Sequence, residues 1–75
     1  MKLHNLKQRE KSVEEYTMEF DYLMIKCDIV EPEEQTIARY LGGLKPEIGN
    51  VVQLQPYWTY VDVCKLAIKV QRQQT

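Results

Sequence analysis

Few side chains in this 75-residue sequence could carry nucleophilic or metal chemistry. There is one histidine, His4, and the two cysteines, Cys27 and Cys64, are distant from it and from each other in the chain. A cysteine nucleophile needs a base close by, and zinc sites use closely spaced Cys and His ligands. The only histidine lies in an N-terminal segment that is expected to fray, so Ser–His or Cys–His catalysis has no plausible base, and no Cys/His cluster occurs. We therefore expect no nucleophilic centre and no metal site.

Sites for phosphate or acid–base chemistry are not predicted either. Gly42-Gly43 lacks the Lys-Ser/Thr that follows the glycines of a phosphate-binding loop, and it stands where a helix is expected to end. Most acidic residues fall at expected helix starts or on solvated faces, where capping and the helix dipole account for them. We therefore expect no catalytic residue and no cofactor, and a structural or binding role instead of an enzyme.

Composition predicts a single small domain over residues 1–75. The sequence is 44% hydrophobic and 28% charged, which is too apolar for a disordered chain. No apolar run reaches the ~18 residues of a membrane span, and the N-terminal residues do not resemble a signal peptide. The net charge of −1 argues against nucleic acid as the main partner, because phosphate binding relies on a basic excess. We expect a cytoplasmic protein with neither a membrane nor a small molecule as partner.

Apolar spacing predicts four helices and no strand. Ser12 and Glu15 form a capping-box pattern that begins a helix running to about Cys27, and the second helix has Pro32 in its first turn and ends at Gly42-Gly43. A third begins near residues 45–47, and a fourth runs from Tyr60 to about Arg72 with Thr59 as its N-cap. We expect residues 1–11 to lead in, with an additional helical turn over 2–7 as an option. Residues 12–72 are expected to form an all-α bundle, and residues 73–75 to start a linker.

The same spacing predicts which side chains are buried. The expected core is Val13, Tyr16, Phe20, Leu23, Ile37, Tyr40, Leu41, Ile48, Val52, Val63 and Ala67. Cys27 and Cys64 also fall within apolar patterns, so we expect both to pack as small hydrophobes without forming a disulfide. For Tyr57 and Trp58, a plug beneath the last loop is favoured over an exposed aromatic anchor.

Two sets of residues suggest a partner. Met18, Tyr22 and Ile25 form a second apolar stripe on the first helix, which either another element of the domain or a protein partner must cover. Lys65, Lys69 and Arg72 line up along the last helix. A solvated face is the favoured interpretation of these three residues, and at most a weak nucleic-acid contact is the alternative.

Several motifs together resemble the Gag proteins of plant Ty3/gypsy retrotransposons. They are Leu6-Lys7-Gln8, Ser12-Val13-Glu14-Glu15-Tyr16, Phe20 and Leu23, then the segment 38–48 (ARYLGGLKPEI), 52–57 (VQLQPY) and 67–73 (AIKVQRQ). The resemblance covers nearly the whole chain. It implies a fold like a retroviral capsid C-terminal domain, in which the major homology region corresponds to Gln8, Val13, Glu15, Tyr16, Phe20 and Leu23.

The resemblance also implies a function. Such domains dimerise and help to build a virus-like particle, so the implied partners are a second copy of the chain and other Gag domains. Related host-captured modules include SCAN dimerisation domains and the neuronal Arc protein, and a captured dimerisation domain is therefore one alternative. A nucleic-acid-binding helical module is another, using the last-helix cations together with basic N-terminal residues (Lys2, Lys7, Arg9 and Lys11).

Two departures from the family pattern affect the expected contact surface. Arg9 stands where the family usually has a glycine after the glutamine, so the tight turn there is expected to differ. The outer face of the second helix, through which retroviral domains dimerise, carries polar Gln35 and Arg39 beside Ala38. The candidate self-association residues are therefore Met18, Tyr22, Ile25, Gln35 and Arg39. Exchange of the first helix in a swapped dimer is a further possibility.

Overall fold

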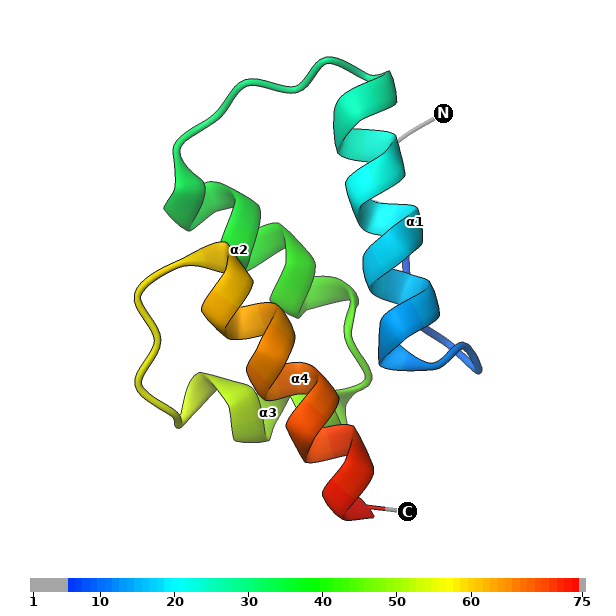
Figure 1. Cartoon of the computed structure of the whole chain (residues 1–75), viewed down its shortest axis with the longest axis vertical. Helices are drawn as coiled ribbons and strands as arrows, with labels where there is room; N and C mark the ends of the chain where they lie inside the picture. The colour runs from blue at the N-terminus through cyan, green and yellow to red at the C-terminus, as the bar shows by residue number, and fades with distance from the viewer. Residues whose placement is uncertain (1–5, 75) are drawn as a thin grey trace.

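The computed structural model describes residues 6–74, and this part of the chain contains four helices and no strand (Figure 1). The helices are α1 (Val13–Lys26), α2 (Glu33–Gly43), α3 (Pro46–Gln53) and α4 (Tyr60–Gln74). The all-α prediction is confirmed. The predicted turn over residues 2–7 falls largely outside the described residues, and Leu6 and Lys7 are not helical.

The start of α1 is the predicted capping box. The Ser12 hydroxyl accepts a hydrogen bond from the Glu15 N–H at 3.1 Å, and the Glu15 carboxylate accepts one from the Ser12 N–H at 3.1 Å. Two N–H groups that the first helical turn would leave without a partner are thereby satisfied. These two local hydrogen bonds therefore determine the residue at which α1 begins.

The end of α1 is a Schellman motif with Asp28 in the left-handed conformation, at φ 51°. The Asp28 N–H donates to the Ile25 carbonyl and the Ile29 N–H to the Met24 carbonyl, both at 3.1 Å. Cys27 is therefore the C-cap, and its side chain is exposed. The expectation that Cys27 packs in the core is wrong, because the chain turns away from the apolar face of α1 at this residue.

The other helix boundaries lie within two residues of their predicted positions. Pro32 is the N-cap of α2 and not part of its first turn, whereas Pro46 occupies the first turn of α3. At the start of α4, the Asp62 N–H donates to the Thr59 hydroxyl and the Thr59 N–H donates to the Asp62 carboxylate, each at 3.2 Å. The last helix continues two residues past Arg72, so residues 73–74, predicted to start a linker, are helical.

The core lies around α4, which packs against each of the other three helices (Figure 1). All eleven residues predicted for the core are buried, and Leu44 and Val70 join them. Cys64 is half-buried, and burial raises the pKa of its thiol, so this group stays uncharged. Both cysteines are free, as expected. Within residues 6–74, no helix has the length and apolar character needed to cross a bilayer.

An aromatic cluster joins α1 to α2 and α4. The Tyr40 ring meets the Phe20 and Tyr60 rings edge-on, with both centroid distances at 5.3 Å. The Tyr16 hydroxyl donates to the Tyr40 carbonyl at 2.8 Å, and the Tyr60 hydroxyl donates to the Asp21 carboxylate at 2.6 Å. Burial raises the pKa of each of these three tyrosines. These ring contacts and hydroxyl hydrogen bonds fix the orientation of α1 in the domain. The face of α1 opposite to the aromatic cluster therefore points toward solvent.

Candidate self-association surfaces

Gln8 connects the segment before α1 to the junction between α2 and α3. Its side chain is 1% exposed, and its amide donates to the Lys11 carbonyl at 2.9 Å and accepts from the Lys45 N–H at 3.0 Å. Its own N–H donates to the Gly43 carbonyl at 2.7 Å. A buried amide with its donor and acceptor both satisfied fixes the path of the chain on both sides of it.

The turn after Gln8 keeps a glycine-like backbone although the residue there is Arg9. Its φ is 52°, in the left-handed region that favours glycine. The Lys11 N–H donates to the Gln8 carbonyl at 3.0 Å and closes the turn. Arg9 thus closes a tight turn in a conformation that favours glycine, and its backbone is strained.

Gly43 is a structural requirement that sequence reasoning missed. A Cβ at this position would overlap the Tyr16 hydroxyl and lie 2.7 Å from the Leu6 carbonyl oxygen. The sequence pattern marked this glycine only as the end of a helix, while Gly42 next to it has open space around its Cα. The close approach depends on tertiary packing, so no local pattern could have revealed it.

The residues assigned to the major homology region have structural roles. Four of them are buried in the core, Gln8 bridges two segments, and Glu15 completes the α1 cap. They lie before α1, in its N-terminal cap and along its buried face. Among residues 6–74, no group of His, Cys, Asp or Glu side chains could hold a metal ion. His4 lies outside the described residues.

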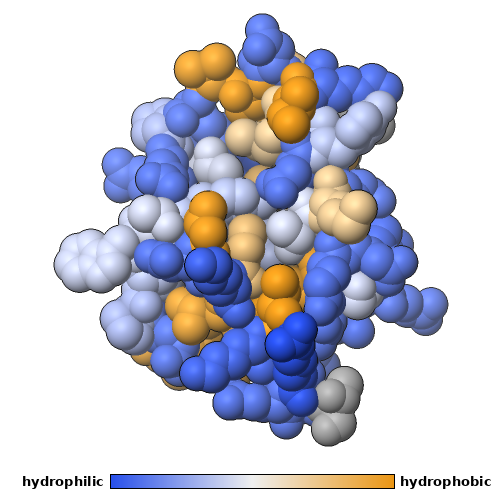
Figure 2. Space-filling model, in the orientation of Figure 1, coloured by the Kyte–Doolittle hydropathy of each residue, from blue (hydrophilic) through white to orange (hydrophobic). Residues whose placement is uncertain are grey.

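The second apolar stripe of α1 faces outward. Met18, Tyr22 and Ile25 are 72%, 58% and 80% exposed, and Val30 in the following connection is also exposed. Lys26 lies 5.5 Å from the centre of the Tyr22 ring, where its cation faces the ring. Figure 2 shows hydrophobic side chains gathered over the end of α1 and the α1–α2 connection. We call Met18, Tyr22 and Ile25 the α1 stripe.

The other two predicted contact residues lie on α2. Gln35 is exposed, whereas Arg39 is half-buried and forms an ion pair with Glu31 at 2.9 Å. Thr36 donates to the same carboxylate at 2.9 Å. The Arg39 guanidinium holds the pKa of Glu31 below its usual range. The Arg39 charge is thus already compensated within the chain, and this face of α2 is polar.

The three cations of α4 are exposed along one side of that helix. Figure 2 shows hydrophilic side chains along this part of the surface. Arg72 also acts within the chain, because its charge contributes to lowering the pKa of Glu14. The structure therefore places Lys65, Lys69 and Arg72 along one exposed side of α4, as the spacing predicted.

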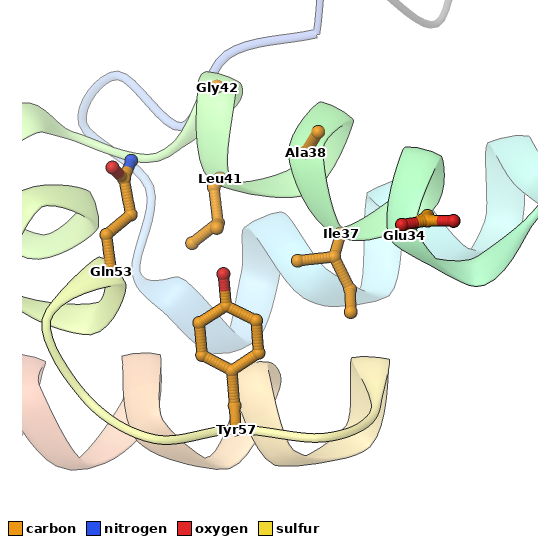
Figure 3. Close-up of a pocket in the computed structure, with 7 residues that line it drawn as sticks. All are labelled: Glu34, Ile37, Ala38, Leu41, Gly42, Gln53 and Tyr57. Carbon is orange, nitrogen blue, oxygen red and sulfur yellow. The ribbon is translucent and has the colours of Figure 1, made fainter.

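The α3–α4 connection departs from the prediction. Trp58 is 88% exposed, so it is not a plug beneath the loop, and Leu54 in the same connection is exposed as well. Tyr57 is half-buried and its ring lies beside α2. Next to it is an open groove of about 460 Å³ (Figure 3), lined by Glu34, Ile37, Ala38, Leu41, Gly42, Gln53 and Tyr57.

Comparison with known proteins supplies the family. The model of the PEG10/RTL1 C-terminal capsid-like domain, a Ty3/gypsy-derived Gag capsid domain, matches residues 1–73. A search of curated proteins and a search of solved structures each gave no match. The resemblance of the sequence to a Gag capsid C-terminal domain is confirmed over nearly the whole chain. This protein belongs to the family of PEG10/RTL1 C-terminal capsid-like domains.

Proposed function

We propose that this chain associates with copies of itself and thereby helps to build a Gag-type particle in the cytoplasm. Membership of a capsid-like family supports a structural role. The observation that carries self-association is the exposed α1 stripe, in which three large apolar side chains are more than half exposed on one helix face. Single exposed hydrophobic residues are common on monomers, but a contiguous stripe marks a contact surface.

The geometry of the stripe suits pairing of α1 with α1 of a second copy. Spacings of four and three residues place the side chains in one row along the helix, as in helix–helix contacts. A contact of this kind is its own complement across a two-fold axis, which is the usual symmetry of a homodimer. Gln35 and Arg39 would then lie outside the main contact, because they belong to the polar face of α2.

The test is the molar mass of the purified chain by light scattering over a hundredfold concentration range. The combined variant Met18→Ser, Tyr22→Ser and Ile25→Ser removes the stripe, and we expect the dimer to be weakened at least about tenfold. The matched control changes Lys65, Lys69 and Arg72 to Ser, which alters three exposed positions on α4. A wild-type mass that does not rise with concentration, or a stripe variant that associates as the wild type does, contradicts the proposal.

The control variant also tests the second candidate function, a nucleic-acid contact. Exposure of Lys65 and Lys69 on one side of α4 is the observation that favours it. If the α4 cations bind phosphates, a single-stranded RNA oligonucleotide binds with an affinity that falls steeply with salt, and the control variant loses this binding. RNA binding that is equally strong in the variant assigns it to other residues.

A further inference from the structure

Trp58 is presented to solvent on a firmly held backbone. The Trp58 and Thr59 N–H groups both donate to the Asp62 carboxylate at 3.2 Å, and the Tyr60 N–H donates to Glu33 at 2.8 Å. The connection is therefore tied to both α4 and α2. An exposed indole on a fixed backbone loses little conformational freedom when it becomes buried in a contact, and tryptophan is the residue most enriched among binding hot spots.

The groove beside Trp58 has the chemistry to hold such a side chain. Ile37 and Leu41 of α2 point toward the Tyr57 ring, and Ala38 lies at the rim of the groove with its side chain directed away from that ring (Figure 3). Polar groups lie at the two ends, the Glu34 carboxylate at one and the Gln53 amide at the other. An indole has a large apolar surface and a single N–H donor, so the apolar walls match its ring and the carboxylate oxygen matches its N–H.

We propose that Trp58 of one copy inserts into the α2–Tyr57 groove of a second copy, and that the second copy does the same in return. The anchor and the groove are neighbours in the chain, since Tyr57 lines the groove and Trp58 follows it. A two-fold contact needs an anchor and a receptor on one surface, and here the anchor is the residue that directly follows Tyr57 of the groove. The inference goes beyond the proposed dimer because it uses a different surface.

The expected size of this contact makes it a weak one. Each indole buries up to about 200 Å² and covers at most a similar area of groove, so the two insertions bury no more than about 800 Å² in total, less than the ~1,200 Å² of a stable specific interface. Figure 1 places α1 and the α3–α4 connection on opposite sides of the molecule. A chain with one contact on each side grows beyond a dimer, and weak contacts are strengthened when many act together.

Trp58 is the only tryptophan of the chain, so its fluorescence reports this contact directly. The experiment uses the α1 stripe variant, in which the proposed dimer is removed, at concentrations up to on the order of 1 mM. We expect the emission to move to shorter wavelength and acrylamide quenching to fall as concentration rises. Ala38→Glu places a charge at the rim of the groove, at an exposed helical position, and should abolish both changes. Leu54→Ser, an exposed residue of the same connection, should leave them intact.

A second measurement separates this contact from the proposed dimer. With the α1 stripe intact, Trp58→Ser should leave the dimer and remove larger species from sedimentation profiles. Emission that is independent of concentration, whether from an exposed indole or from one buried in its own groove, overturns the inference, and so does a shift that survives Ala38→Glu. If the stripe variant associates normally while Trp58→Ser does not, the proposed dimer fails and the Trp58 contact stands.

Discussion

At the residue scale, the segment before α1 depends on two neighbouring side chains with opposite effects. Gln8 is buried and satisfies the Lys11 carbonyl in the turn and the Lys45 N–H at the α2–α3 junction. Arg9 holds the turn at a positive φ that is unfavourable for any residue with a Cβ. The stabilising contacts of Gln8 compensate for the strain at Arg9. Local strain of this kind persists only where the surrounding structure determines the conformation.

Replacing Arg9 with glycine should therefore stabilise the domain. The change relieves a left-handed residue that costs roughly 1–2 kcal/mol, and the greater freedom of glycine in the unfolded chain offsets part of this gain. We expect the free energy of unfolding to rise by about 0.5–1 kcal/mol. Urea denaturation at one low protein concentration measures this difference while keeping self-association out of the comparison.

Arg9→Ala is the control, because it removes the charge and keeps the strain. It should not stabilise the domain. If Arg9→Ala stabilises as much as Arg9→Gly, the gain comes from the loss of the arginine side chain, and the turn at Arg9 is not under strain.

At the element scale, the start of α1 can be predicted from the sequence, whereas its end cannot. The capping box at Ser12 has a recognisable pattern, and α1 was placed correctly from it. The Schellman turn at its other end has Asp28 in the position where glycine is usual, so the pattern extended the helix to Cys27 and placed that cysteine in the core. The prediction of this helix end was wrong because Asp28 occupies a position where glycine is the common residue.

Asp28→Gly should stabilise α1. Glycine fits the left-handed position, and the change also removes an acidic group from the negative end of the helix dipole. We expect an increase of about 1 kcal/mol in the free energy of unfolding. Asp28→Asn separates the two causes, because it removes the charge while it keeps a residue that tolerates this conformation. Equal gains from Asn and Gly would attribute the whole effect to charge.

At the scale of the whole molecule, the apolar pattern predicted the core well because helix faces follow directly from spacing. All eleven residues predicted for the core are buried. The α1 stripe was predicted as a second apolar face, to be covered either by another element of the domain or by a partner. Whether the stripe was covered, and where Trp58 and Leu54 point, depends on the paths of the connections between helices. Those paths are set by long-range contacts, such as the one from Tyr60 to Glu33, which have no local signature.

One long-range contact joins the two ends of the helical core. The Gln71 side chain accepts from the Val13 N–H at 2.6 Å and donates to the Glu14 carboxylate at 2.8 Å. Gln71→Met keeps the length of the side chain and loses both bonds. We expect it to lower the free energy of unfolding by about 1–2 kcal/mol, because the Val13 N–H is left without this partner. Gln73→Met, at an exposed position on the same turn, should have little effect.

This contact also makes stability depend on pH. The hydrogen bond from Gln71 holds the pKa of Glu14 below its usual range in the folded chain, so the ionised carboxylate stabilises the fold above the usual pKa and this contribution is lost as the pH falls. In Gln71→Met the pKa of Glu14 should rise toward its usual value, which an NMR titration of the carboxyl carbon measures. A pKa that does not move would mean that Gln71 is not its main cause.

The bond between Gln71 and Val13 also determines how the domain can be attached to other sequences. The chain enters its helical core and leaves it at the same end of the molecule, within reach of one side chain (Figure 1). Residues 6–12 run back from the start of α1 to the end of α2, where the Gln8 N–H donates to the Gly43 carbonyl (Figure 1). Polypeptide joined on both sides would therefore leave the domain at separate places, and tension along such a chain would load both the Gln8 and the Gln71 contacts, while the α1 stripe and Trp58 would stay free to meet their neighbours.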